Sequence, residues 1–189
     1  CTPEFLLQFG LVGSLYAKKY LGVASPKVGL LNIGTEDTKG TPLQKEAYAL
    51  LQKAADKGML NFVGNVEARD VPMGAVDVVV CDGFTGNMVL KTYEGVAITM
   101  MKIMKHMFTD SAKGKIAAAF LMKDLKGIKE KFDYNKYGGA PILGASKPVF
   151  KAHGDSKATT MFNAIKLSTN YVSANAIAEI TTALSGDKR

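Results

Sequence analysis

The sequence predicts an α/β fold, in which a largely parallel β-sheet is covered by helices on both faces. Two observations lead to this fold class. Short apolar runs of the kind found in buried strands alternate with stretches of helical period, and helix-capping residues stand at the starts of several of those stretches. No internal repeat or low-complexity tract interrupts the alternation. Residues 1–189 are therefore expected to form a single domain.

The first third of the chain predicts a helix, a strand and a second helix. The first helix is predicted to begin after the N-cap Thr2, with Pro3 at its first position, and to end at Gly22. The apolar residues at helical spacing within it are Phe5, Phe9, Val12, Leu15 and Tyr16. Residues 28–33 are nearly all apolar, as in a strand covered on both faces. After the loop 34–40, a Thr-Pro-Leu-Gln capping box predicts a helix over residues 41–57.

The rest of the chain continues the same alternation. Residues 60–66 and 76–81 read as two further strands. A loop at 82–87 leads to a long helix with a Met-rich apolar stripe, which is typical of a core or of a subunit interface. The stripe consists of Val89, Tyr93, Val96, Met100, Met104 and Met107. A second helical segment, 111–131, is interrupted at Gly114 and Gly127, and the chain breaks at 137–141. A short strand at 149–152 and one final long helix complete the prediction.

Composition narrows the class of protein. At 189 residues with 47% apolar side chains, the chain can bury a core without disulfides. Cys1 and Cys81 alone give neither a disulfide framework nor a zinc site, which favours a reducing cytoplasm and no metal. The apolar stretch 116–122 is far shorter than the ~20 residues of a membrane-spanning helix. Because the chain begins with Cys1, we expect it to be a fragment of a longer protein.

The net charge of +7 is unevenly distributed. Between Lys102 and Lys136 nine lysines stand against four acidic residues, so this segment alone carries +5. A local basic segment indicates an acidic partner or surface, and the alternative is a solvated helix face. Few aromatic residues accompany the lysines, so nucleic-acid binding is not predicted.

Candidate site residues follow four predicted strands. In open α/β sheets, ligands bind beyond the carboxyl ends of the strands, and the four loops there should share one rim. The chemically capable residues in or beside these loops are Lys39, Arg69, Asp82, Thr85, Asn87 and His153. Together with loop glycines and two helix N-termini, they would suit an anion of the size of phosphate. Each also has an ordinary interpretation: loop aspartates make turns, and Arg69 can pair with Asp70.

Several standard motifs are absent. The sequence lacks Gly-x-Gly-x-x-Gly, the Gly-x-Ser-x-Gly elbow and Cys/His metal spacing. Gly29 to Gly34 has the spacing of a Walker motif, but Thr35 stands where the lysine should be. These absences disfavour dinucleotide, nucleotide and serine-hydrolase interpretations.

Five segments of the chain are distinctive in combination. In order, they are 27–37 (KVGLLNIGTED), 61–70 (NFVGNVEARD), 77–89 (DVVVCDGFTGNMV), 137–140 (YGGA) and 151–154 (KAHG). Together they resemble a known family, the bacterial phosphate acyltransferases (PlsX). The resemblance covers nearly the whole chain but only the carboxyl-terminal part of the family. It implies that the isolated chain, which lacks the family's amino-terminal part, has no activity of its own. It also implies a fold like that of isopropylmalate dehydrogenase and phosphotransacetylase, with a protruding helical segment at 88–136 and a homodimer.

The resemblance implies transfer of a long acyl group from acyl carrier protein to inorganic phosphate, without a cofactor. The product, acyl phosphate, would be used by a membrane acyltransferase in phospholipid synthesis. In this scheme Lys39 binds and neutralises phosphate, and Asn87 hydrogen-bonds the phosphate or the developing oxyanion. Arg69, Asp82, Thr85 and His153 are further phosphate or substrate ligands.

The basic segment has two candidate partners in this scheme, acidic acyl carrier protein and the anionic membrane. An apolar run bracketed by Lys115 and Lys123 suits shallow insertion among lipid headgroups. The predicted membrane contacts are Ile116, Phe120, Leu121 and Met122. The alternative is burial of this run in a dimer interface. The expected location is the cytoplasm, peripherally on the inner face of the membrane.

Two other functions remain open from the sequence. The chain could be a non-catalytic dimer- and membrane-binding module. It could also be a relative of phosphate acetyltransferase, which uses coenzyme A, or of isopropylmalate dehydrogenase, which uses NAD. A requirement for coenzyme A or NAD would favour these relatives, whereas dependence on acyl carrier protein favours the acyltransferase.

Overall fold

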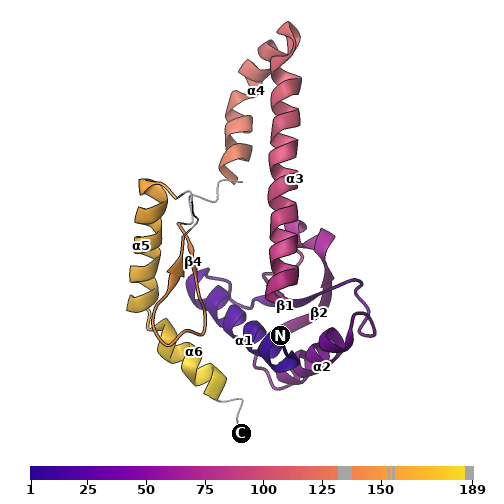
Figure 1. Ribbon diagram of the computed structural model, residues 1–189, viewed down its shortest axis with the longest axis vertical. Coiled ribbons are helices and arrows are strands. Elements are labelled where there is room, and N and C mark those ends of the chain that lie inside the picture. The colour runs from indigo at the N-terminus through magenta and orange to yellow at the C-terminus, as the bar shows by residue number, and fades with distance from the viewer. Residues whose placement is uncertain (132–137, 153, 155, 186–189) are drawn as a thin grey trace.

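A three-stranded parallel sheet organises the fold. The computed structural model describes residues 1–131, 138–152, 154 and 156–185 (Figure 1). The strands β1 (Lys27–Asn32), β2 (Asn61–Glu67) and β3 (Val78–Val80) are arranged in the order β2-β1-β3, with both neighbours parallel to β1. The α/β class and the parallel sheet predicted from the sequence are confirmed.

Helices α1 (Pro3–Tyr20) and α2 (Pro42–Asp56) pack side by side on one face of this sheet. Alternating residues of the strands face them, because successive strand side chains point to opposite faces. The core between helices and sheet includes Leu6, Leu7, Leu11, Val28, Leu30, Ala47, Leu51, Phe62 and Val80. Gly10 allows this approach, since a Cβ there would lie 2.7 Å from a methyl group of Leu51. Both helices begin where their capping residues predict.

Helix α1 is buried on two sides, and the sequence prediction of its buried face is wrong in part. Phe5 and Phe9 are about half exposed, at 49% and 48%, whereas Leu6 and Leu11 are buried against the sheet. Val12 belongs to a second apolar cluster with side chains from the C-terminal part of the chain: Leu143, Phe150, Tyr171, Ile177, Ile180 and Leu184. A single-stripe prediction fails because a helix between two layers has more than one apolar face.

Strand β2 contains a bulge at Gly64. The register pairs Val28 with Phe62 but Leu30 with Asn65, so β2 has one residue more than β1 in this interval. Gly64 has φ +97°, a conformation that glycine adopts without the strain of a Cβ. The bulge brings Asn65 to the same sheet face as Leu30, which faces α1 and α2.

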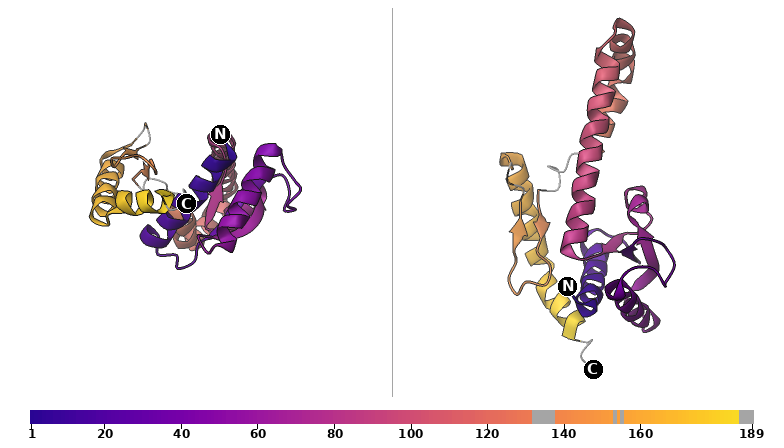
Figure 2. Two further views of the ribbon diagram at one scale, coloured as in Figure 1. Left: turned by 90° about the horizontal axis from the view of Figure 1, so that it is seen from below. Right: turned by 45° about the vertical axis from the view of Figure 1, so that its right-hand side comes forward.

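Helices α3 (Gly83–Thr109) and α4 (Ala112–Lys131) form a hairpin that projects from the rest of the molecule (Figures 1 and 2). The predicted interruptions of the second helix at Gly114 and Gly127 are wrong, since α4 runs through both. None of the residues of α3 is fully buried. Three members of the predicted apolar stripe, Val96, Met100 and Met107, are more than half exposed. Within this chain the stripe is therefore not a core.

The C-terminal part forms a separate layer against α1. The chain does not simply break at 137–141, because Ala140–Pro141 (β4) pairs antiparallel with Phe150–Lys151 (β5). The single long final helix is also wrong: α5 (Ala158–Ser173) and α6 (Ala176–Ser185) are separated at Asn175, which has φ +55°. Asparagine tolerates this left-handed conformation better than most residues. Lys19 of α1 pairs with Glu179 of α6 at 3.3 Å.

Candidate functional site

Three of the four predicted loops share one edge of the parallel sheet. They follow β1, β2 and β3, whose carboxyl ends point the same way. Asn65 donates from Nδ2 to the Glu36 carbonyl at 2.7 Å, which ties the first loop to β2. The Tyr93 hydroxyl donates to the Ala68 carbonyl, which ties α3 to the short 3-10 helix η1 (Ala68–Met73). The shared rim is confirmed for these loops.

The strand that precedes the fourth loop does not belong to the parallel sheet. The loop follows β5, which pairs with β4 in a separate antiparallel pair and not with the parallel sheet. The prediction that this short strand belongs to the same parallel sheet as the others is therefore wrong. His153 itself lies outside the described residues.

Lys39 lies exposed in the loop between β1 and α2. Its N–H donates to the Glu36 carbonyl at 3.2 Å, and its own carbonyl accepts from Asn32 Nδ2 at 3.1 Å. Its aliphatic chain lies over Gly34, where a Cβ would be 3.1 Å from Lys39 Cγ. Among the described residues, its ammonium has no carboxylate within 4 Å and no hydrogen bond. The backbone of Lys39 is fixed, and its charge is available to an anion.

The end of this loop is held by Asn32 and Gly40. Gly40 has φ +90°, and a Cβ there would meet the Asn32 amide at 2.6 Å. Asn32 Oδ1 also accepts the N–H of Ile33 at 2.9 Å. The capping box of Thr41 and Gln44 then starts α2 immediately. One asparagine side chain thus joins the two ends of the loop that carries Lys39.

Asp82 and Thr85 form the N-terminal cap of α3. Asp82 Oδ1 accepts the Thr85 N–H at 2.8 Å, and Oδ2 accepts the Thr85 hydroxyl at 2.6 Å. The hydroxyl first, and the backbone N–H next, hold the pKa of Asp82 below its ordinary value. The carboxylate occupies the positive end of the helix, where an external anion would otherwise bind. Asp82 and Thr85 therefore have the ordinary structural role of residues at a turn, which here starts a helix.

Cys81 lies half-buried beside this cap. Its sulfur is 2.9 Å from the position that a Cβ of Gly86 would take. Burial, and then the charge of Asp82, raise the pKa of the Cys81 thiol. The thiol therefore stays protonated at neutral pH and is a poor nucleophile.

Asn87 lies in α3 and not in a loop. The sequence prediction of a loop over 82–87 is wrong, since the Asp82 cap starts the helix at Gly83. The two glycines of this segment do not delay the helix, because a cap satisfies N–H groups that would otherwise lack partners. Asn87 is exposed in the second turn of the helix. Its side chain is free to contact a ligand beside the rim.

Arg69 makes the expected ion pairs. It lies 2.7 Å from Glu67 and 3.9 Å from Asp70, with its side chain 76% exposed. Such an exposed pair contributes little to stability, and Arg69 can exchange its carboxylate partner for another anion.

Two cations, Lys39 and Arg69, accompany five carboxylates at this rim. The five are Glu36, Asp37, Glu67, Asp70 and Asp82. Three of these carboxylates are already engaged, Glu67 and Asp70 by Arg69 and Asp82 by Thr85.

Sequence reasoning missed Asn32, Asn65 and Tyr93, whose side chains connect the rim. An available signal was the Gly64-Asn65 pair inside an apolar strand, because a glycine there indicates a bulge. Among the described residues, no group of three His, Cys, Asp or Glu side chains is placed to hold a metal ion.

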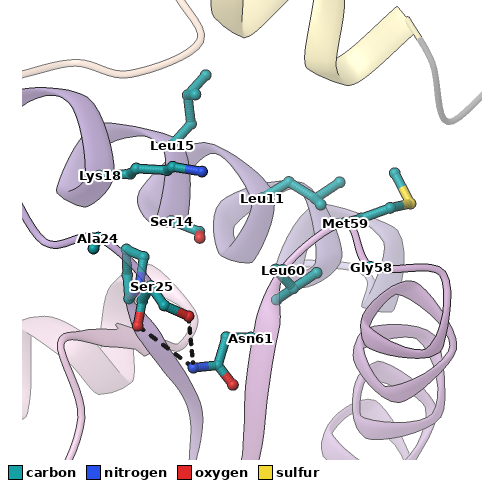
Figure 3. Close-up of a pocket in the computed structure, with 11 residues that line it drawn as sticks. Leu11, Ser14, Leu15, Lys18, Ala24, Ser25, Gly58, Met59, Leu60 and Asn61 are labelled. Atoms are coloured by element: carbon teal, nitrogen blue, oxygen red, sulfur yellow. Dashed lines mark hydrogen bonds between the residues drawn. The ribbon is translucent and has the colours of Figure 1, made fainter.

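A cavity of about 640 Å³ lies at the opposite edge of the sheet, near the amino ends of β1 and β2 (Figure 3). Leu11, Leu15 and Leu60 line it, with Ser25 and Asn61 hydrogen-bonded to each other at 3.2 Å. The predicted site residues do not line this cavity. It is therefore separate from the rim.

The predicted membrane contacts lie on the hairpin. Ile116 and Phe120 are 62% and 84% exposed, and Leu121 is 43% exposed. The side chain of Met122 lies outside the described residues. Lys113 and Lys115 are exposed beside them. No helix in the described part of the chain is long and apolar enough to cross a membrane.

Comparisons with known proteins identify the family. The family model described as "Fatty acid synthesis protein" matches residues 1–179. The phosphate acyltransferase of Oceanobacillus iheyensis is 50% identical over 179 residues, which cover 95% of this chain and 53% of that protein. The phosphate acyltransferase of Brevibacillus brevis is 53% identical over 90% of this chain and 50% of its own length. The phosphate acyltransferase of Bacillus subtilis is 46% identical over 98% of this chain and 55% of its own length.

The chain spans about half the length of the curated relatives it matches. The family match over residues 1–179 of this chain includes the rim, the hairpin and most of the C-terminal layer. The chain therefore belongs to the fatty acid synthesis protein family, and it is similar to bacterial proteins named phosphate acyltransferase.

Proposed function

We propose that the protein to which this sequence belongs transfers a long acyl group from acyl carrier protein to inorganic phosphate, forming acyl phosphate for phospholipid synthesis. The observation that carries this proposal is the identity of 46–53% to phosphate acyltransferases over at least 90% of the chain. The exposed ammonium of Lys39 at the rim supports it. Because the relatives are about twice as long, the activity is proposed for a chain of their length.

The reaction sets simple demands on the protein. A phosphate oxygen attacks the thioester carbonyl, a C–O bond forms, and the C–S bond breaks. The departing sulfur takes up the proton that phosphate gives up, so the products are acyl phosphate and a thiol. Phosphate is already a nucleophile, and no electrons are exchanged with a third reactant. The protein has to hold phosphate beside the thioester and to stabilise the oxyanion that develops.

Lys39 and Asn87 are the residues we propose for this work. Lys39 binds phosphate and neutralises part of its charge, and the Asn87 amide donates a hydrogen bond to phosphate or to the oxyanion. Arg69 is proposed as a second phosphate ligand, which would exchange its present carboxylate partners for the substrate. His153 stays a proposed ligand on the family resemblance alone.

For Asp82 and Thr85 we propose an indirect role in substrate binding, because they stabilise the start of the helix beside the site. Their side chains bond to each other, so direct contact with phosphate would require breaking the cap. We infer that they hold α3, and with it Asn87, at the rim.

Replacement of Lys39 tests the proposal. In a chain of the relatives' length, Lys39→Ala is expected to lower acyl phosphate formation about 100-fold, since one transition-state contact is worth roughly 3 kcal/mol. Hydroxylamine converts the acyl phosphate to a hydroxamate that can be measured, once the hydroxamate formed from the thioester in the absence of phosphate has been subtracted. Lys45→Ala, which removes an exposed lysine from α2, is the matched control and should retain full activity. Turnover of Lys39→Ala within threefold of the parent excludes Lys39 from the site.

We also propose that the hairpin serves peripheral attachment to the anionic inner face of the membrane and association with a second copy. The exposed Phe120 and Leu121, next to lysines, suit lipid headgroups. The exposed stripe on α3 suits an identical helix of a homodimer. Attachment would place the product near the membrane acyltransferase that consumes it, with the protein otherwise in the cytoplasm. The lysines would also attract acidic acyl carrier protein.

A further inference from the structure

The loop that carries Lys39 rests on a buried amide. Asn65 is only 9% exposed, and its Nδ2 donates to the Glu36 carbonyl at 2.7 Å. The same carbonyl accepts the N–H of Lys39 at 3.2 Å. One carbonyl oxygen therefore receives both hydrogen bonds, one from the turn that ends at Lys39 and one from β2. The position of that turn depends directly on the Asn65 side chain.

The bulge at Gly64 directs this side chain. Without the extra residue, the alternation of β2 would turn Asn65 to the sheet face away from α2. With it, Asn65 pairs in register with Leu30 and lies on the face of α2 and the loop. A Cβ at Gly64 would have ordinary contact with the Tyr48 hydroxyl at 3.8 Å, but the residue would have to adopt φ +97°. Bulges commonly re-aim a side chain beside an active site.

The amide oxygen of Asn65 shows that apolar packing alone does not explain why an asparagine is buried at this position. Its Oδ1 is buried and has no hydrogen-bond partner among the described residues. An unpaired buried acceptor is unfavourable, so an apolar residue of similar volume would suit the packing better. The side chain contributes through the hydrogen bond that it donates.

We propose that Asn65 is a positioning residue for Lys39: its amide, directed by the bulge at Gly64, holds the Glu36 carbonyl and so fixes the point from which the Lys39 ammonium meets phosphate. The inference rests on the proposed function of Lys39. Asn65 does not itself touch the reacting atoms.

The first experiment replaces Asn65 by Leu, which keeps the branched skeleton of four heavy atoms and removes the donor, in a chain of the relatives' length. Activity is expected to fall roughly 10- to 100-fold, because a misplacement of about 1 Å costs this much. The thermal unfolding midpoint should move by less than about 3 °C, since an unpaired acceptor is removed together with the donor. Asn61→Leu is the matched control. It removes an amide from the other end of the same strand, where Asn61 bonds to Ser25. It should keep full activity.

A double-variant cycle shows whether the effect passes through Lys39. In the Lys39→Met background, Asn65→Leu is expected to change activity by less than about threefold, because residues that act as a unit are not additive. A loss as large as in the parent background overturns the proposal. Full activity of Lys39→Met beside a loss in Asn65→Leu also overturns it.

Hydrogen exchange provides a readout that does not depend on acyl transfer. Asn65→Leu should speed exchange of the amides at 34–40 and leave those of β1 unchanged. Faster exchange throughout the sheet indicates a general structural role and overturns the proposal, as does no change. If this pattern and the coupling to Lys39 hold but acyl carrier protein is not the donor, only the proposed donor is wrong.

Discussion

Asn87 and Asp82 lie close together in the sequence, but the structure separates their roles. Asp82 caps α3, and its carboxylate is engaged with Thr85. Asn87 lies in the second turn, where backbone N–H groups already bond within the helix. A helix-capping role for Asn87 is thereby excluded. The exposed Asn87 amide is therefore available for the ligand contact proposed above.

Replacement of Asn87 should therefore separate activity from stability. Asn87→Ala is expected to leave the free energy of unfolding within about 0.5 kcal/mol of the parent or to raise it, because Ala favours an exposed helix site. Acyl phosphate formation should fall, and Asn87→Asp should be equally damaging because its charge repels phosphate. The two measurements are urea unfolding and the hydroxamate assay. Activity retained by Asn87→Asp and lost by Asn87→Ala would contradict a hydrogen-bond donor role.

At the scale of elements, the start of α3 depends on the ionised carboxylate of Asp82. Thr85 holds the pKa of this group below its ordinary value of 3.8. A carboxyl group with a lowered folded pKa adds stability above the unfolded pKa, and this stability is lost as the pH falls through the folded pKa. The cap should therefore stabilise the protein fully at neutral pH, contribute less as the pH falls below 3.8, and contribute nothing once the pH has passed the lowered folded pKa.

Asp82→Ala tests this expectation. At pH 7 the free energy of unfolding should fall by about 1 kcal/mol, the usual contribution of an N-cap. The difference from the parent should shrink as the pH drops below 3.8. Asp82→Asn, which keeps an acceptor oxygen for the Thr85 N–H, should lose less. Denaturant unfolding at pH 7 and pH 3 measures both, and an equal loss at both pH values would show that the charge does not matter.

The elements that the sequence predicts well are those determined by local chemistry. Thr2 with Pro3, and Thr41 with Gln44, start helices because their side chains bond to nearby backbone or to each other. Elements that depend on distant contacts are less predictable. The break at Asn175 and the pairing of β4 with β5 arise where the C-terminal layer packs on α1, and no glycine or proline marks Asn175.

The same distinction holds for the candidate site. The rim follows from parallel strands, so Lys39, Arg69 and Asp82 could be assigned to one edge from the sequence. Their partners could not be assigned, because the hydrogen bond between Asn65 and Glu36 spans 29 positions and depends on a one-residue bulge. The pairing of β5 with β4 instead of the parallel sheet was equally unpredictable, since β5 is too short for its pairing to show in the sequence.

At the scale of the molecule, the hairpin of α3 and α4 projects away from the sheet (Figure 2). It carries many exposed apolar and basic side chains. Exposed large apolar residues on α3 and α4 include Ile98, Met100, Ile103, Met107, Ile116 and Phe120. The exposed lysines between them are Lys102, Lys105, Lys113 and Lys115. Each lysine near an anionic bilayer contributes about 1 kcal/mol, and this attraction weakens with salt.

Vesicle flotation tests the membrane proposal. The protein should float with phosphatidylglycerol vesicles, less so at high salt, and Phe120→Asp combined with Leu121→Asp should release it. Met161→Asp with Phe162→Asp is the matched control, because these neighbours on α5 are also exposed, at 46% and 66%. Unchanged binding of the hairpin variant excludes this run as the lipid contact. A hairpin variant that dissociates into unfolded monomers would place the run in an interface between copies.

The position of α1 between two layers has a consequence for synthesis of the chain. One side of the helix packs against the sheet, and the other packs against Tyr171 and Ile180. Lys19 and its partner Glu179 are 160 positions apart. At 5–20 residues per second, roughly 10 to 30 s pass between the emergence of α1 from the ribosome and that of its last partners. During this time the surface around Val12 is exposed to solvent, and chaperones can bind an apolar helix face that is buried in the folded protein.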